Sequence, residues 1–172
     1  MDNISNKKVV VIGSGPGGYA SAFRAADLGL DVTLIDKDTN LGGVCLNRGC
    51  IPSKAFLHIA HVIEETQNIS DKGVKFDKPS IDIKKINNWK NDIVTKLTSG
   101  IKSLSNQRNV NFINGNASFL SANRLLIKNG TKNDEINFDF CIIATGSSPS
   151  KLNDINLDHK FIINSTDPLS PT

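Results

Sequence analysis

The chain has 172 residues, 20 Lys and Arg, 17 Asp and Glu, and a formal net charge of +3. This length allows about one domain with a real hydrophobic core, and it is too short for a typical multidomain cofactor enzyme. Charges of both signs are interspersed, so charge-driven binding to nucleic acid or to a membrane surface is not expected. No apolar run approaches the roughly 18 residues of a transmembrane helix.

The N-terminal residues 1–8 are polar and contain no apolar signal-peptide segment, so a cytoplasmic location is expected. Asn, Ile and Lys number 20, 20 and 16, and the Asn-rich loops therefore count weakly as signs of function. The 3 cysteines argue against a structural disulfide framework in that compartment and leave room for a reactive pair.

The first 36 residues predict a strand–helix–strand unit. A continuous apolar run is typical of a strand buried on both faces, and an Ala-rich segment ended by Gly29 is typical of a helix. The predicted elements are a strand at 9–12, a glycine-rich turn at 13–18, a helix at 19–28 and a strand at 32–35.

The rest of the chain predicts two helices followed by short strands. Apolar residues at spacings of three and four give the second helix one continuous stripe that includes Trp89. We expect helices at 44–65 and 82–105, an antiparallel meander at 110–113, 117–120, 124–128 and 135–138, and a buried strand at 140–144. Residues 148–172 carry several prolines and many polar residues, which is typical of a linker.

The turn at Gly13, Gly15 and Gly18 has the spacing of a dinucleotide-binding fingerprint. In such a site the first glycine allows a tight turn, the second lets a pyrophosphate approach the backbone, and the third lets helix and strand pack closely. The helix start supplies free N–H groups and a positive dipole end. Asp36, at the end of the next strand, would accept hydrogen bonds from ribose hydroxyls, which favours FAD or NAD over NADP.

Cys45 and Cys50 are five residues apart in a predicted helix. On a regular helix their Cα atoms would be about 8.5 Å apart, beyond the roughly 7 Å that a disulfide tolerates. Either the two are unpaired or the helix start is distorted, and Gly49 and Pro52 make distortion plausible. A helix N-terminus would also lower the thiol pKa values.

Together these motifs resemble the N-terminal part of a flavin disulfide reductase, and within that group the dihydrolipoamide dehydrogenases. The resemblance rests on residues 9–36, on the block at 42–54 and on 144–147, and it extends over nearly all of the chain. Leu46, Ile51 and Ser53 resemble the lipoamide enzymes, since glutathione and mercuric reductases usually have Val at the first two positions and glutathione reductases tend to have Lys at the third.

The resemblance implies a Rossmann-like α/β FAD-binding domain at 1–147, with only its N-terminal half present, and a linker at 148–172 towards an NAD-binding domain that the chain lacks. It implies that Cys45 and Cys50 form the redox-active disulfide, with Cys45 as the interchange thiol and Cys50 next to the flavin. Asp36 stands where Glu is commoner, and Ala117 where Gly is usual. The implied FAD-binding residues are Gly13, Gly15, Pro16, Gly18, Asp36, Lys37, Leu41, Gly42, Gly43, Val44, Lys54, Gly115, Ala117, Ala144, Thr145 and Gly146.

The implied function is FAD-dependent oxidation of dihydrolipoyl groups with NAD⁺ as final acceptor. Implied partners are the lipoyl domains of 2-oxoacid dehydrogenase acyltransferases or the glycine cleavage H protein, with a homodimer for the full-length protein. The alternatives are another disulfide reductase, of the mercuric or glutathione type, and a truncated, inactive FAD-binding remnant. The His-x-His-Pro segment that carries the family's catalytic base does not occur in these residues.

Other chemically capable side chains are expected to be structural. His58 and His61 fit a packing or surface role on their helix, and Cys141 fits a small apolar residue in a buried strand. No spacing of His, Cys, Asp or Glu suggests a metal site.

Overall fold

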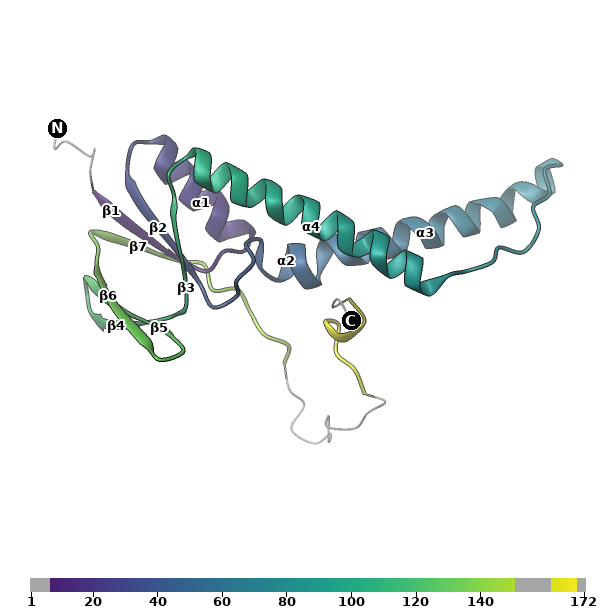
Figure 1. Ribbon diagram of the computed structural model, residues 1–172. Coiled ribbons are helices and arrows are strands. Elements are labelled where there is room, and N and C mark those ends of the chain that lie inside the picture. The colour runs from purple at the N-terminus through teal and green to yellow at the C-terminus, as the bar shows by residue number, and fades with distance from the viewer. Residues whose placement is uncertain (1–6, 151–161, 170–172) are drawn as a thin grey trace.

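The computed structural model describes residues 7–150 and 162–169, which fold into two sheets and a long helical arm (Figure 1). A 4-stranded sheet has the order β3-β2-β1-β7, and a 3-stranded sheet has the order β4-β5-β6. The predicted α/β class, a Rossmann-like parallel sheet with an antiparallel meander, is confirmed. No helix among the described residues is both long and apolar enough to span a membrane.

The parallel sheet contains β1 (Lys8–Ile12), β2 (Asp31–Asp36), β3 (Asn111–Asn114) and β7 (Phe140–Ile143). β1 is central and pairs in parallel with both β2 and β7. Its Val9, Val10 and Val11 are at most 4% exposed, which confirms the strand buried on both faces. Successive side chains of β1 point to opposite faces of the sheet, as they do along any strand.

One face of the sheet packs against helices and the other against the meander (Figure 1). Val9 and Val11 pack with α1 (Pro16–Asp27), and Ile101 of α4 (Ile83–Gln107) covers the same cluster. On the other face, Val10 joins a cluster with residues of the meander strands β4 (Asn116–Ser121), β5 (Arg124–Asn129) and β6 (Lys132–Asn137). Leu125, on β5, is fully buried there. The glycine-rich turn therefore follows directly after a strand that is packed on both faces.

The segment at 110–113, predicted as the first meander strand, belongs instead to the parallel sheet. It is β3, and it pairs in parallel with β2, with Asp36 opposite Asn114. A four-residue strand gives no periodicity signal for the direction of its partner, and here the three helices between β2 and β3 return the chain for parallel pairing. Gly115 continues the pairing by donating its N–H to the Asp36 carbonyl at 2.8 Å.

The helix predicted at 44–65 is broken into α2 (Gly43–Arg48) and α3 (Cys50–Asn68). Gly49 separates them with φ −140° and ψ −109°, far from helical values. After a short 3₁₀ turn (Ile69–Lys72), α4 returns beside α3, and the two form an arm that extends away from the sheets (Figure 1). Asp82 caps α4 by accepting a hydrogen bond from the Lys85 N–H at 3.1 Å.

The stretch predicted as a linker is described only in part, and residues 151–161 and 170–172 lie outside the described structure. Residues 162–169 end in a 3₁₀ turn at Asp167–Leu169. Lys90 of α4, which is 1% exposed, donates from Nζ to the Leu169 carbonyl at 3.3 Å and lies over the Phe56 ring. Its burial lowers the pKa of Lys90. The domain division at residue 147 stays a prediction.

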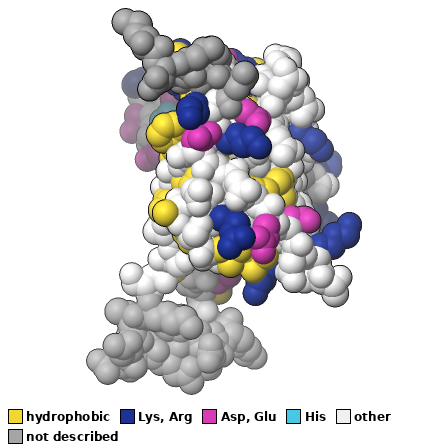
Figure 2. Space-filling view, turned by 90° about the vertical axis from the view of Figure 1, so that its left-hand side faces the viewer, with side chains coloured by type: hydrophobic (Ala, Val, Ile, Leu, Met, Phe, Trp, Pro, Cys, Tyr) yellow, Lys and Arg dark blue, Asp and Glu magenta, His cyan; other side chains and the backbone are white. Residues whose placement is uncertain are grey.

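The molecular surface at the end where β1 begins carries intermingled basic and acidic side chains with small separate apolar patches (Figure 2). Lys7 and Asp139 form one of the ion pairs, at 3.4 Å. This mixture agrees with the small net charge of +3.

Candidate dinucleotide site and cysteine pair

The glycine-rich turn is closed on the protein side and open on the other. Gly13 has φ +101°, and a Cβ there would lie 2.2 Å from the Ala144 carbonyl oxygen. A Cβ on Gly18 would lie 1.7 Å from the Gly13 carbonyl oxygen. A Cβ on Gly15 would contact only the Gly43 Cα, at 4.0 Å. Gly15 is thus the position at which a ligand could approach the backbone.

Helix α1 starts directly behind this open position. Its N-cap is Gly15, which offers no side-chain hydrogen bond, and Pro16 occupies the first turn. The backbone N–H groups of the first turn therefore have no protein side chain as acceptor at the cap, and the helix dipole places positive potential there. This combination favours a phosphate or another anion.

The Asp36 carboxylate is bound by the turn itself. Its Oδ2 accepts hydrogen bonds from the Ser14 backbone N–H at 2.6 Å and from the Ser14 hydroxyl at 2.7 Å. Its Oδ1 accepts one from the Asp38 N–H at 2.9 Å. Sequence reasoning assigned no role to Ser14, because only the fold shows that its hydroxyl points at the second strand.

A cavity of about 180 Å³ lies beside Asp36 at the carboxyl edge of the sheet. The parallel β2–β3 pairing forms it, because that register carries Gly115 and the start of β4 past the end of β2. Ile12, Ile35 and Asn116 line it. So do six residues singled out from the sequence, which are Gly13, Asp36, Lys37, Gly115, Ala117 and Thr145. Asn116 was not predicted, although it lies between two predicted residues.

The segment before the first cysteine packs directly on the glycine-rich turn. Gly42 donates its N–H to the Ser14 carbonyl at 2.9 Å, and a Cβ on Gly43 would lie 2.6 Å from the Gly15 Cα. Leu41 is buried, whereas Val44 is 50% exposed on α2. The backbone at 41–44 and the glycine-rich turn are therefore two walls of one site.

The two cysteines lie on different helices, Cys45 within α2 and Cys50 at the start of α3. The break at Gly49 confirms the distorted helix start, and the two thiols are also unpaired in this structure. Both cysteines are free, with Cys45 partly buried and Cys50 exposed. Lys54 is one helical turn beyond Cys50 on α3.

The pKa of the Cys45 thiol is raised from its ordinary value of 9.0, first by its hydrogen bond with the Cys50 side chain and then by burial. The positive charge of Lys54 acts in the opposite direction. The expected lowering of the thiol pKa is therefore wrong for Cys45. The reason is that the hydrogen bond with Cys50 and burial outweigh the position of Cys45 in the first turn of α2.

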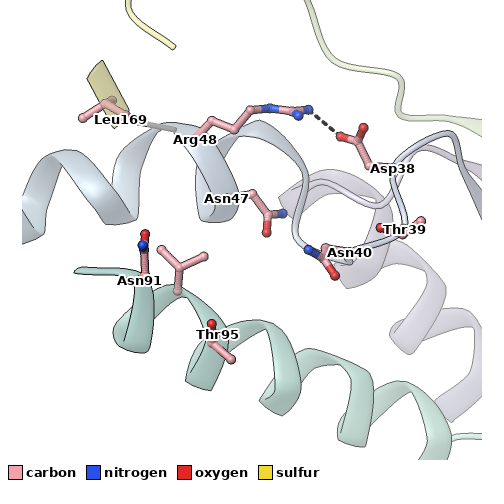
Figure 3. Close-up of a pocket in the computed structure, with 9 residues that line it drawn as sticks. Asp38, Thr39, Asn40, Asn47, Arg48, Asn91, Thr95 and Leu169 are labelled. Carbon is pink, nitrogen blue, oxygen red and sulfur yellow. Dashed lines mark hydrogen bonds and ion pairs between the residues drawn. The ribbon is translucent and has the colours of Figure 1, made fainter. Parts of the chain in front are cut away.

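A second, larger cleft of about 390 Å³ lies between α2 and α4 (Figure 3). Arg48 at the end of α2 forms an ion pair with Asp38 across its rim. The other lining side chains are mostly amides and hydroxyls: Thr39, Asn40, Asn47, Asn91 and Thr95, with Val94 and Leu169. None of the residues singled out from the sequence lines this cleft, and it contains no thiol, so it is not the candidate site.

The side chains expected to be structural have the following surroundings. The His58 ring lies 6.3 Å from the Trp89 ring, and exposed His61 pairs with Glu65 at 3.3 Å. Cys141, on β7, is partly buried, and burial raises its thiol pKa. Trp89 is 39% exposed, so its stripe on α4 is only partly covered. No group of His, Cys, Asp or Glu in the described part of the chain is arranged to hold a metal ion.

The sequence also matches a known protein family. The model of the pyridine nucleotide-disulphide oxidoreductase family matches residues 7–170. The chain belongs to this family. The match spans both the glycine-rich turn and the cysteine pair, which are the features on which the predicted resemblance rested.

Relatives in this family include dihydrolipoyl dehydrogenases of two strains of Buchnera aphidicola. They are 51% and 53% identical over 163 and 169 residues, which are 95% and 96% of this chain. The dihydrolipoyl dehydrogenase of Vibrio parahaemolyticus is 48% identical over 94% of the chain. The predicted resemblance to these enzymes is confirmed. The chain spans about a third of the length of these relatives, 34% to 36%.

A solved structure supports the same assignment of the fold. The HOCl-induced flavoprotein disulfide reductase of Escherichia coli, determined as a Cu(II) complex, superposes with a TM-score of 0.79 and 25% sequence identity. The superposition covers 96% of this chain and 34% of that structure.

Proposed function

We propose that the protein is an FAD-dependent dihydrolipoyl dehydrogenase. The observation that carries the proposal is that the carboxyl edge of the parallel sheet brings together an uncapped helix start, the Asp36 carboxylate and the segment that leads directly into Cys45. A backbone contact between the 41–44 segment and the glycine-rich turn joins the cofactor side of the site to the cysteine side. Relatives named dihydrolipoyl dehydrogenase at 48% to 53% identity support the choice of substrate class.

FAD fits the residues present. The open side of Gly15 and the free N–H groups of α1 would hold the pyrophosphate, and the cavity beside Asp36 would hold the adenosine. Gly42 and Gly43 would complete the pyrophosphate side. Ala144 and Gly146 are further residues that would hold FAD, and Lys54 would stabilise negative charge on the flavin ring. Bound FAD supplies a two-electron acceptor that takes electrons from the cysteine pair and passes them to NAD⁺.

The cysteine pair would exchange with the substrate. A thiolate of dihydrolipoamide attacks the Cys45 sulfur of the Cys45–Cys50 disulfide, and the Cys50 sulfur leaves as a thiolate. The second substrate thiolate then attacks the mixed disulfide and releases Cys45. The substrate becomes a disulfide and the pair becomes two thiols, so two electrons and two protons are transferred. The surroundings of Cys45 raise its thiol pKa, so in the reverse reaction, in which this thiol attacks a substrate disulfide, a base would assist by removing its proton.

The proposed partners are lipoyl domains of 2-oxoacid dehydrogenase acyltransferases or of the glycine cleavage H protein. We also propose a homodimer, a cytoplasmic location and the domain division predicted from the sequence. These are properties of the whole protein, and the chain spans about a third of its relatives, 34% to 36%.

The test has two independent readouts on the purified protein: bound flavin by absorbance, and dihydrolipoamide-dependent reduction of NAD⁺. We expect stoichiometric FAD, and we expect Cys45→Ser and Cys50→Ser to abolish turnover while FAD stays bound. Cys141→Ser is the matched control and should keep both. Turnover with glutathione disulfide or Hg²⁺ but not with lipoamide would refute the substrate, and absence of flavin would refute the cofactor.

A further inference from the structure

Ser14, the second residue of the glycine-rich turn, has all three of its polar atoms in hydrogen bonds. Its N–H and its hydroxyl both donate to Asp36 Oδ2, at 2.6 Å and 2.7 Å. Its carbonyl accepts from the Gly42 N–H at 2.9 Å. Ser14 is completely buried, at 0% exposure. It therefore cannot contact a ligand directly, and any effect on the ligand must pass through Asp36 or Gly42.

These bonds leave the Asp36 carboxylate little capacity for a ligand. A carboxylate offers about four acceptor positions, two on each oxygen. Ser14 occupies both positions on Oδ2, and the Asp38 N–H occupies one on Oδ1 at 2.9 Å. One position, on Oδ1, remains. The carboxylate is also fixed in rotation, because both of its oxygens are bonded to separate parts of the backbone.

We propose that Ser14 is a positioning residue that orients Asp36 so that it binds one ribose hydroxyl of the adenosine, not both. This inference rests on the proposed binding of FAD. A freely rotating carboxylate could accept from two neighbouring hydroxyls, one on each oxygen, whereas the oriented one presents a single acceptor. The specificity at the ribose is thus set by a side chain that the ligand does not touch.

The test compares the affinities of the purified apoprotein for FAD and for two analogues, FAD with 2′-deoxyadenosine and FAD with 3′-deoxyadenosine, measured by quenching of flavin fluorescence. We expect one analogue to bind about tenfold more weakly than FAD, the size of one lost hydrogen bond to a charged group. The other analogue should bind within about twofold of FAD. An equal loss with both analogues would overturn the proposal.

Ser14→Ala removes the hydroxyl and leaves both backbone bonds of this residue in place. One acceptor position on Asp36 Oδ2 then becomes available to the second ribose hydroxyl, so we expect the difference between the two analogues to fall to about twofold or less. Ser105→Ala is the matched control, because Ser105, on α4, is also buried and its hydroxyl donates to the Val110 carbonyl, away from the site. It should keep the tenfold difference.

The outcomes separate this inference from the proposed function. If the wild-type protein binds no FAD, the proposed function fails. If FAD binds and Ser14→Ala discriminates between the analogues as the wild type does, the positioning role of Ser14 fails and the proposed function stands. The analogue comparison on the wild type decides the single-hydroxyl claim even if Ser14→Ala does not fold.

Discussion

Replacing Gly18 by alanine tests whether close packing of α1 on the glycine-rich turn holds the site together. The added Cβ would lie 1.7 Å from the Gly13 carbonyl oxygen. Real Cβ atoms essentially never approach closer than 3.0 Å, so the backbone must separate by about 1.3 Å. The Cβ is attached rigidly to the backbone of α1 and the oxygen belongs to the backbone of the turn, so no side-chain rotation can relieve the overlap.

The magnitude follows from two opposing effects. Overpacking of a well-packed site costs typically 1–3 kcal/mol, and this overlap belongs at about 3 kcal/mol. Alanine in place of glycine in a helix returns up to about 1 kcal/mol. The net loss in the free energy of unfolding is about 2 kcal/mol. For a chain of this size that lowers the melting temperature by roughly 4–8 °C.

Gly17→Ala is the matched control in the same helical turn. A Cβ on Gly17 would meet nothing within 4 Å, so its stability should stay within about 1 kcal/mol of the wild type. Unfolding in urea, followed by far-UV circular dichroism, measures both variants, and titration with FAD measures the site. If Gly18→Ala were as stable as Gly17→Ala and bound FAD equally well, the reasoning about close approach would be wrong.

Three further changes have outcomes set by the structure. Leu125→Ala should destabilise the protein by about 3 kcal/mol in urea unfolding, because Leu125 is 0% exposed between the two sheets; Leu120→Ala, at 43% exposure, should cost much less. Alkylation of the reduced protein at a series of pH values, followed by mass spectrometry, should give a pH midpoint for the reactivity of Cys45 above 9.0. In Lys54→Met this midpoint should move further upward, because the charge that lowers the thiol pKa is lost. A midpoint below pH 9.0 in the wild type would contradict the raised pKa. The pKa of Asp139 is lowered, first by the hydrogen bond that its carboxylate accepts from the Lys8 N–H, so its stabilising effect is present above pH 3.8 and is lost as pH falls through the lowered pKa. Asp139→Asn should therefore flatten the fall in the free energy of unfolding at acid pH, and an unchanged fall would contradict the assignment.

Elements whose residue pattern is local formed where the sequence predicted them. The run Val9–Val11 is apolar without alternation, and only a strand buried on both faces accommodates such a run. The glycine-rich turn follows it at once, and Asp82 marks the start of α4 as an N-cap should. The β4–β5–β6 hairpins likewise follow from turn residues between short apolar segments.

The predictions from sequence are least accurate where the structure depends on contacts between segments that are far apart in the chain. The strand at Asn111–Asn114 is too short to show which neighbour it pairs with, and the space left beside β2 decides it. The break at Gly49 separates two segments that each look helical, and the residues alone left a distorted helix start as one of two alternatives. Nothing local in the sequence indicates that Lys90 is buried; Leu169 and Phe56 supply a carbonyl and a ring for its ammonium group.

By itself the sequence determined the family resemblance, the order of most elements, and the residue types at the candidate site. Those features are encoded within a few residues of chain, in glycine spacing, apolar runs and the cysteine block. Only the tertiary structure decided that Ser14 engages Asp36, that β3 brings Gly115 beside it, and that the pKa of Cys45 is raised. These depend on which groups lie within hydrogen-bonding distance or are withdrawn from water, and segments far apart in the chain set those distances.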